Sequence, residues 1–91
     1  MAQATLLVRH DVEDYAAWRT VYDSIDGLRA EHGCTADEVL LDPANGQDVY
    51  VIHRFPSLEQ AQGFASSSEL REAMGRAGVA GAPRIEIAVE A

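Results

Sequence analysis

The sequence of 91 residues has one cysteine, no lysine and no long apolar run. Cys34 cannot form a disulfide within the chain and gives no zinc-site spacing, so we expect a half-buried strand residue there. No apolar run approaches the ~18 residues that a membrane-spanning helix needs. The N-terminus also lacks the basic-then-apolar order of a signal peptide, so we expect a cytoplasmic protein with no membrane partner.

Basic charge is also scarce. Seven basic residues, all arginine, stand against 15 acidic residues, and the formal net charge is −8 at pH 7. Nucleic acids and anionic membrane surfaces attract proteins with a basic patch, so this balance argues against both as partners. The sequence has no G-x-G-x-x-G pattern, no phosphate loop and no Cys/His zinc spacing, and it therefore gives no support to nucleotide or structural zinc binding.

The length predicts a single domain, residues 1–91. A chain of this size buries roughly 60–65% of the surface that its unfolded form exposes, which suffices for one two-layer core. It leaves little room for a deep cavity as well, and dimerisation would enlarge the core. The composition, 47% apolar and 24% charged, is typical of a globular protein.

Residues 14–33 have the strongest pattern in the chain. Their large apolar residues recur at steps of three and four: Tyr15, Trp18, Tyr22 and Ile25, with Val21 and Leu28 beside them. This spacing predicts one amphipathic helix that packs its apolar stripe on a sheet. Asp11 or Asp14 can cap its start, and Gly33 suits the left-handed turn that ends a helix. Gly27 is a weak point at which a bend is possible.

Four segments have the composition and alternation of β-strands. They are residues 4–10, 34–41, 48–55 and 84–90. The first has apolar residues on both faces, which predicts a central strand covered on two sides, whereas the polar first half of the second predicts an edge strand or a late start. The segment DPANGQD before the third strand contains proline and an Asn-Gly pair and predicts a turn.

The second helical region is predicted in two parts. Ser57 and Gln60 have the spacing of a capping box, the serines at 66–68 interrupt the helix, and a further helix has Glu69 in its first turn and ends in the glycine-rich segment 78–83. The order is β-α-β-β-α-β. This order predicts an α+β, ferredoxin-like fold with a four-stranded antiparallel sheet.

Five features in this order carry a resemblance that spans almost the whole chain. They are Asp14-Tyr15 with Trp18, the Leu28-Arg29 end of the first helix, the Asp42-Pro43 turn, the phenylalanine that closes a strand before Ser57-Leu58-Glu59, and SSELREAMGRAGV at 67–79. Together they resemble the dimeric α+β-barrel proteins, which include antibiotic-biosynthesis-monooxygenase-like domains and small polyketide cyclases.

The resemblance implies a homodimer in which two four-stranded sheets curl into a barrel, with a pocket between sheet and helices in each subunit. Relatives include cofactor-free oxygenases acting on aromatic polyketides, aldol-type cyclases and haem-degrading enzymes, and the fold alone does not choose among them. Haem degradation in the relatives uses a histidine on the second helical region. Residues 57–78 contain none, so we expect no haem and no other cofactor.

His10 and His53 are the candidate catalytic residues. In this fold the first and third strands are antiparallel neighbours, so the two side chains lie near opposite ends of the shared ladder, on the order of 10–15 Å apart at ~3.3 Å per residue. They could line one pocket, but they could not hold one metal ion, and no metal site is predicted. Alternatively, each is a strand-end histidine with a backbone or carboxylate partner and no catalytic role.

The predicted pocket wall is apolar and would bind a small hydrophobic or aromatic molecule. Its residues are Trp18, Tyr22, Val51, Phe64 and Met74. The first hypothesis is a cofactor-independent monooxygenase-like or cyclase-like enzyme of secondary metabolism that acts on an aromatic or polyketide-type metabolite. The second is a non-catalytic dimeric binding or stress-associated protein, in which the same residues form a core and the pocket is largely filled.

The opposite face of the predicted sheet carries residues that would meet the partner subunit. Arg9, Tyr50, Arg54 and Glu86 lie on this face by strand parity, as does Glu90. Arginine–glutamate pairs across the interface would fix the register of the two subunits. We therefore assign the first four to the dimer interface as a hypothesis.

Overall fold

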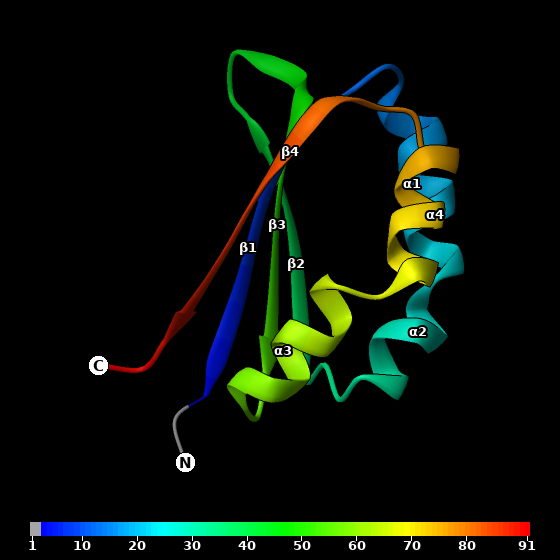
Figure 1. Cartoon of the computed structure of the whole chain (residues 1–91). Coiled ribbons are helices and arrows are strands. Elements are labelled where there is room, and N and C mark those ends of the chain that lie inside the picture. Colours follow the sequence, from blue (N-terminus) through cyan, green and yellow to red (C-terminus); the bar gives the residue numbers. More distant parts are fainter. Residues whose placement is uncertain (1–2) are drawn as a thin grey trace.

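The computed structural model describes residues 3–91 (Figure 1). The elements are β1 (Ala4–Val12), α1 (Tyr15–Ser24), α2 (Asp26–Glu31), β2 (Ala36–Asp42), β3 (Asn45–Phe55), α3 (Leu58–Ala65), α4 (Ser68–Arg76) and β4 (Val79–Val89). The strands form one sheet in the order β2-β3-β1-β4, with every neighbouring pair antiparallel. This is the predicted ferredoxin-like α+β fold.

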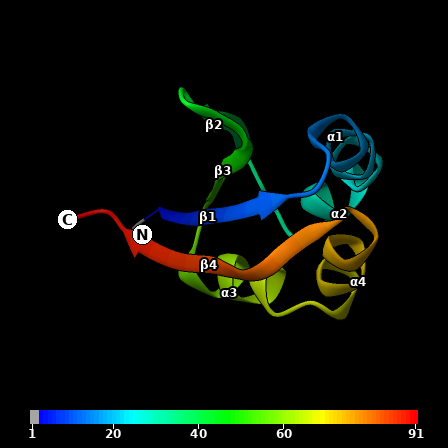
Figure 2. The same cartoon turned by 90° about the horizontal axis from the view of Figure 1, so that it is seen from above.

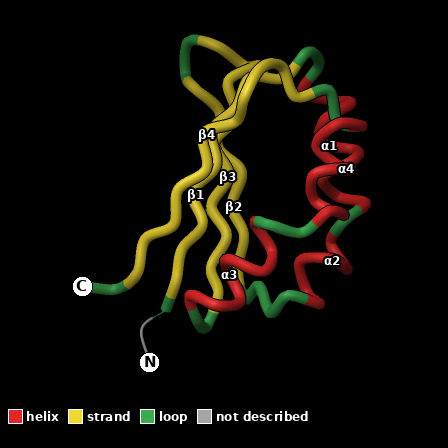
Figure 3. Tube along the Cα trace, viewed as in Figure 1, coloured by secondary structure: helices red, strands yellow, loops and turns green. Residues whose placement is uncertain are grey.

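The molecule has two layers, with the sheet on one side and the helices on the other (Figure 3). The view from above shows α1 and α4 side by side, with α3 beneath β4 (Figure 2). No helix in the part of the chain that the structure describes is long and apolar enough to span a bilayer.

The core lies between the helices and the inward-facing residues of β1 and β3. These buried residues alternate along each strand: Ala4, Leu6, Val8, His10 and Val12 on β1, and Val49, Val51, His53 and Phe55 on β3. β1 is central, as predicted. No part of the chain covers its second face within the described residues, and Leu7 on that face is 37% exposed.

The helix predicted over residues 14–33 is broken at Ile25, whose φ and ψ of −102° and 21° are not helical. Asp14 caps α1 by accepting a hydrogen bond from the N–H of Ala16. A helix end leaves carbonyl groups that need other hydrogen-bond donors. At this break the Tyr22 oxygen accepts from the N–H of Ile25 at 3.3 Å and from the guanidinium group of Arg29 at 2.8 Å. The second segment, α2, then ends before Gly33, which has the predicted positive φ of 83°.

The remaining differences from the predicted boundaries concern turns. Cys34 is half-buried but lies before β2, which starts late and is an edge strand. The β2–β3 turn is at residues 43–44, so the Asn-Gly pair belongs to β3 rather than to the turn. β4 begins at residue 79, inside the segment predicted as a loop, and Gly78 with φ 75° makes the turn before it.

The start signals of the last two helices are confirmed. The Ser57 hydroxyl accepts from the N–H of Gln60, which is the first of the two bonds of the predicted capping box before α3, and it donates to the Gln60 side-chain oxygen. Ser67 accepts from the N–H of Leu70 and caps α4. The serine-rich break therefore separates two short helices and lets both face the same side of the sheet.

Candidate functional site

A narrow cavity of about 50 Å³ lies between the sheet and the helices. All five residues predicted to bind substrate line it: Trp18, Tyr22, Val51, Phe64 and Met74. Both candidate catalytic histidines, His10 and His53, also line it. The structure thus brings these seven residues together, and their part in binding or catalysis stays a prediction.

The size of the cavity limits what it holds in this form. Pockets for drug-sized ligands have volumes of about 300–1,000 Å³. Trp18, Tyr22 and Phe64 are 3%, 6% and 0% exposed and close most of the space. A polycyclic compound does not fit unless side chains move, and Met74, a half-buried and flexible residue of α4, is the wall residue best able to do so.

Rings from α1 and the sheet form a continuous row along the cavity. The centroid of His10 is 5.6 Å from that of Trp18, Trp18 is stacked 4.9 Å from Tyr22, and Tyr22 is stacked 5.9 Å from His53. Phe64 from α3 meets the His53 ring edge-on at 5.3 Å. The spacing of residues 18 and 22 along α1 sets this row, since residues four apart share one helix face.

A hydrogen-bonded relay joins one end of the row to the protein surface. The Tyr22 hydroxyl lies 2.9 Å from Nε2 of His53 and donates to the carboxylate of Asp37 at 2.7 Å. Asp37 is on the edge strand β2, directly opposite His53 on β3, and is exposed to solvent. The other ring nitrogen of His53, Nδ1, is buried and has no hydrogen-bond partner within residues 3–91.

Burial controls the charge of both histidines. It lowers the pKa of His53 to about 4, and the nearby Arg29 guanidinium lowers it further, while Asp37 acts in the opposite direction. Burial also lowers the pKa of His10, partly offset by Asp11 and Asp48. Neither ring nitrogen of His10 has a partner within the described residues. His53 is therefore neutral at pH 7, with a free lone pair on one nitrogen.

Arg29 is a buried cation beside the relay. Its guanidinium carbon lies 4.0 Å from the centroid of the Tyr22 ring, and its side chain is 6% exposed. Its ion-pair partner, Asp26, is 3.4 Å away and 83% exposed, so solvent weakens that pair. The positive charge on Arg29 thus acts mainly on Tyr22 and His53. The pKa of Tyr22 is nevertheless raised, because burial and the hydrogen bond to Asp37 favour the neutral phenol.

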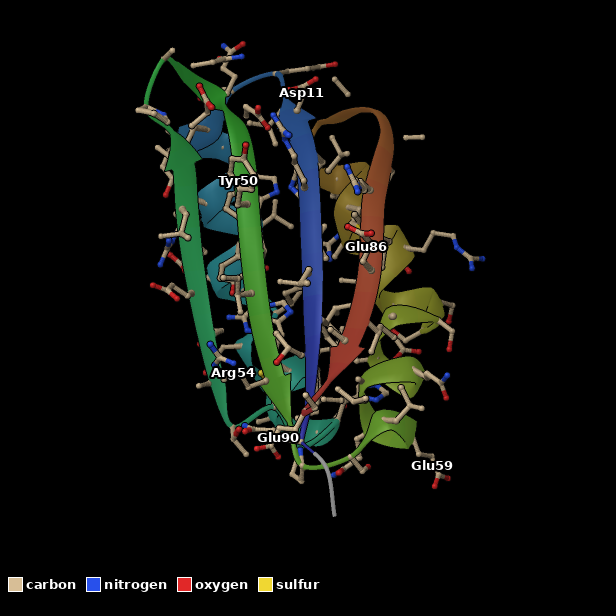
Figure 4. All side chains as sticks on the ribbon, turned by 90° about the vertical axis from the view of Figure 1, so that its left-hand side faces the viewer. Asp11, Tyr50, Arg54, Glu59, Glu86 and Glu90 are labelled. Carbon is tan, nitrogen blue, oxygen red and sulfur yellow. The ribbon has the colours of Figure 1, made fainter. Side chains whose placement is uncertain are left out.

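The predicted interface residues lie on the open face of the sheet. Figure 4 shows this face, with Tyr50, Arg54 and Glu86 on the side of the sheet that no helix covers. Arg9 forms two hydrogen bonds to Asp48, at 2.7 and 3.2 Å, and lies over the Tyr50 ring. Glu86 pairs with Arg84 of its own strand. These charges are partly satisfied within the chain, and their role between subunits stays a prediction.

Sequence reasoning missed Asp37 and Arg29. Asp37 reaches the site only because the pairing of β2 with β3 sets it opposite His53. Arg29 enters because the helix break at Ile25 turns it back onto Tyr22. Residues seven apart share one face of a helix, but this spacing does not show that Arg29 is buried against Tyr22, and the strand register could not be read from the sequence.

Solved structures share this fold. A candidate antibiotic biosynthesis monooxygenase from Bordetella bronchiseptica superposes with a TM-score of 0.83 at 11% identity, covering 100% of this chain and 99% of that one. SnoaB, a cofactor-independent oxygenase from Streptomyces nogalater, gives 0.75 at 11% identity, covering 100% and 93%. The NE2512 protein from Nitrosomonas europaea gives 0.76 at 22% identity, covering 99% and 90%.

No protein-family model matches the chain, and no curated protein matches its sequence. The similarity to the solved structures shows that the chain has the ferredoxin-like fold found in antibiotic biosynthesis monooxygenase-like proteins. At these identities the likeness defines the fold and does not carry over an activity or a substrate.

Proposed function

We propose that the chain is a homodimeric, cofactor-independent enzyme that removes a proton from a small, mainly apolar ring compound held between sheet and helices. The observation that carries this proposal is the buried, unpaired Nδ1 of His53, a residue that lines an apolar cavity. Leaving a buried polar atom unpaired costs about 1–3 kcal/mol. A ligand that offers a hydrogen to this nitrogen would recover that cost.

Proton removal is the step that two candidate reactions share. A cofactor-independent oxygenase needs a substrate anion that reacts with oxygen, and an aldol-type cyclase needs an enolate that attacks a carbonyl carbon. In both, the proton passes from the substrate to Nδ1 of His53. The lowered pKa keeps this nitrogen free to accept at pH 7, and the anion formed beside it raises the pKa of the imidazolium. His10, at the other end of the row, is the second candidate base.

A specific observation supports the alternative of a non-catalytic binding protein. The cavity of about 50 Å³ is too small for a polycyclic metabolite unless its walls move. In this alternative the aromatic row packs the core and carries out no chemistry. The two candidates differ in whether a bound compound loses a proton, and one probe compound can separate them.

The probe is 2-tetralone, a two-ring ketone with exchangeable hydrogens beside its carbonyl group. Binding is followed by fluorescence of Trp18, the one tryptophan of the chain, which lines the cavity. Catalysis is followed by NMR as deuterium exchange at the activated carbon in D₂O. We expect exchange faster than in buffer, lost in His53→Gln and kept in His32→Gln, a matched change outside the cavity. Binding without faster exchange supports the alternative, and no binding rejects both ligand-dependent functions for compounds of this size.

The homodimer is proposed on the open sheet face. Leu7 and Leu40 on this face are 37% and 44% exposed, and a shallow hollow lined by both leucines and by Tyr50 lies between them. A second copy supplies a matching apolar surface, and its arginine and glutamate residues can pair with Glu86, Arg9 and Arg54 of the first. Light scattering after size exclusion would give a mass near twice 9.9 kDa if the proposal is right.

A further inference from the structure

Tyr22 has one hydroxyl hydrogen and two neighbours that compete for it. The oxygen lies 2.7 Å from the Asp37 carboxylate and 2.9 Å from Nε2 of His53. An ionised carboxylate can only accept hydrogen bonds, whereas a neutral imidazole nitrogen can accept or donate. The hydrogen therefore goes to Asp37, and the bond to His53 forms only if Nε2 carries a hydrogen and donates it to the Tyr22 oxygen.

We infer that Asp37 is a positioning residue that acts through Tyr22 to fix the tautomer of His53. With the carboxylate in place, the imidazole hydrogen is on Nε2 and the lone pair is on Nδ1, the buried nitrogen without a partner. A ligand that reaches this nitrogen then meets a hydrogen-bond acceptor. Without the carboxylate, Tyr22 can donate to Nε2 instead, and the same ligand meets an N–H donor.

The groups around the relay favour this tautomer, with the hydrogen on Nε2 of His53 and the lone pair on Nδ1. The charged and titratable groups around it are Arg19 from α1, Arg29 from α2, Asp37 from β2 and Cys34 from the loop before β2. From α3 the uncharged Phe64 packs against His53. The Arg29 guanidinium lies 4.0 Å from the Tyr22 ring centroid and disfavours an imidazolium nearby. A single hydrogen on the ring, placed by the chain of bonds to Asp37, is thus the favoured state of His53.

The tautomer determines the class of ligand that the site accepts. A free lone pair on Nδ1 favours compounds with an acidic O–H or C–H group, such as phenols and enolisable ketones, over compounds that only accept hydrogen bonds. This consequence rests on the proposed function, whereas the tautomer itself can be measured on the protein alone.

The test is a long-range ¹H–¹⁵N correlation spectrum of the imidazole rings at neutral pH, which distinguishes a nitrogen that carries hydrogen from one that does not. We expect the Nε2–H form of His53 in the wild-type protein. Asp37→Ala should lower the ratio of the two tautomers by about tenfold, because a hydrogen bond to a charged group is replaced by a weaker neutral one. Asp37 is exposed, so the variant should fold.

Two controls isolate the path through Tyr22. Glu38→Ala removes the same charge from the next residue of β2, which points to the other face of the sheet, and should leave the ratio unchanged. In a Tyr22→Phe background, Asp37→Ala should have no further effect, because the link is gone. An Nδ1–H form in the wild type, or an equal response with and without the Tyr22 hydroxyl, would overturn the inference. His10 in the same spectra serves as an internal reference.

The outcomes also separate this inference from the proposed function. If the tautomer responds to Asp37 but 2-tetralone neither binds nor exchanges, the inference stands and the proposed function fails. If exchange is accelerated and His53→Gln abolishes it, but Asp37→Ala leaves the tautomer ratio unchanged, the proposed function stands and the inference fails.

Discussion

Lowering the pH should reduce the folding stability of this protein partly because His53 is buried as a neutral ring. The extent of that burial sets the size of the loss. The side chain is 4% exposed, and its pKa falls from 6.5 to about 4. The folded protein therefore resists protonation of this ring, whereas the unfolded chain accepts a proton near pH 6.5. Because the folded pKa is the lower one for a basic group, folding stability is full above pH 6.5 and falls as the pH drops toward 4.

The magnitude follows from the linkage between protonation and stability. Each unit of pKa difference corresponds to about 1.4 kcal/mol, so the full shift of His53 corresponds to about 3 kcal/mol at low pH. About 2 kcal/mol of this loss should be complete between pH 7.5 and pH 5. For a domain with a typical stability of about 5–15 kcal/mol, this is a large fraction. His10, whose pKa is also lowered, should add to the loss in the same direction.

The assay is urea unfolding at pH 7.5 and pH 5, at one fixed protein concentration because dimerisation would add to the measured stability. Wild type is compared with His53→Gln, and the free energies are subtracted so that carboxylate titrations cancel. We expect the wild type to lose about 2 kcal/mol more than the variant. A difference below about 0.5 kcal/mol would show that His53 is not held neutral by burial, and the reasoning would be refuted.

Three further predictions concern the site, the proposed dimer and the stability of the fold. Arg29→Met should raise the pKa of His53, since the guanidinium lowers it, and an NMR titration of the ring measures this. Leu7→Glu should dissociate the proposed dimer in light scattering, whereas Leu58→Glu, which changes a similarly exposed leucine on α3, should not. Gly33→Ala should destabilise the fold by more than about 1 kcal/mol in urea unfolding, because the position has a φ of 83° and a Cβ would collide with the side chain of Gln60.

The fold could be predicted because its signals are local. The spacing of apolar residues in α1, the alternation in β1 and β3, and the caps at Ser57 and Ser67 each act over a few residues. The break at Ile25 was not predicted, because a carbonyl capped by an arginine seven residues away is a tertiary contact. Local propensity indicated only that Gly27 was a weak point nearby.

On the sheet, only the part of the candidate site on β1 and β3 could be predicted, because strand parity shows which side chains share a face. Parity along β1 and β3 groups each histidine with the apolar residues of its strand, and the structure shows that the helices cover this face. Asp37 depends instead on a register shift in the β2–β3 pairing, between Leu41 and Asp42. Because Asp42 pairs with Asn45, a register that continued without this shift would set Asp37 opposite Tyr50, away from His53. No pattern in the sequence marks such an irregularity.

The interior of the protein combines two features that a purely structural core would avoid. It is narrow and apolar, and yet three ring nitrogens, both of His10 and one of His53, are buried without partners within residues 3–91. Replacing either histidine by an apolar residue of similar size would remove this cost, as it does for other buried polar groups. The Tyr22–Asp37 relay goes further, because it orients His53 and connects the cavity to solvent. A core that only needed filling has no use for such a connection, whereas a site that takes up a proton and returns it to water requires one.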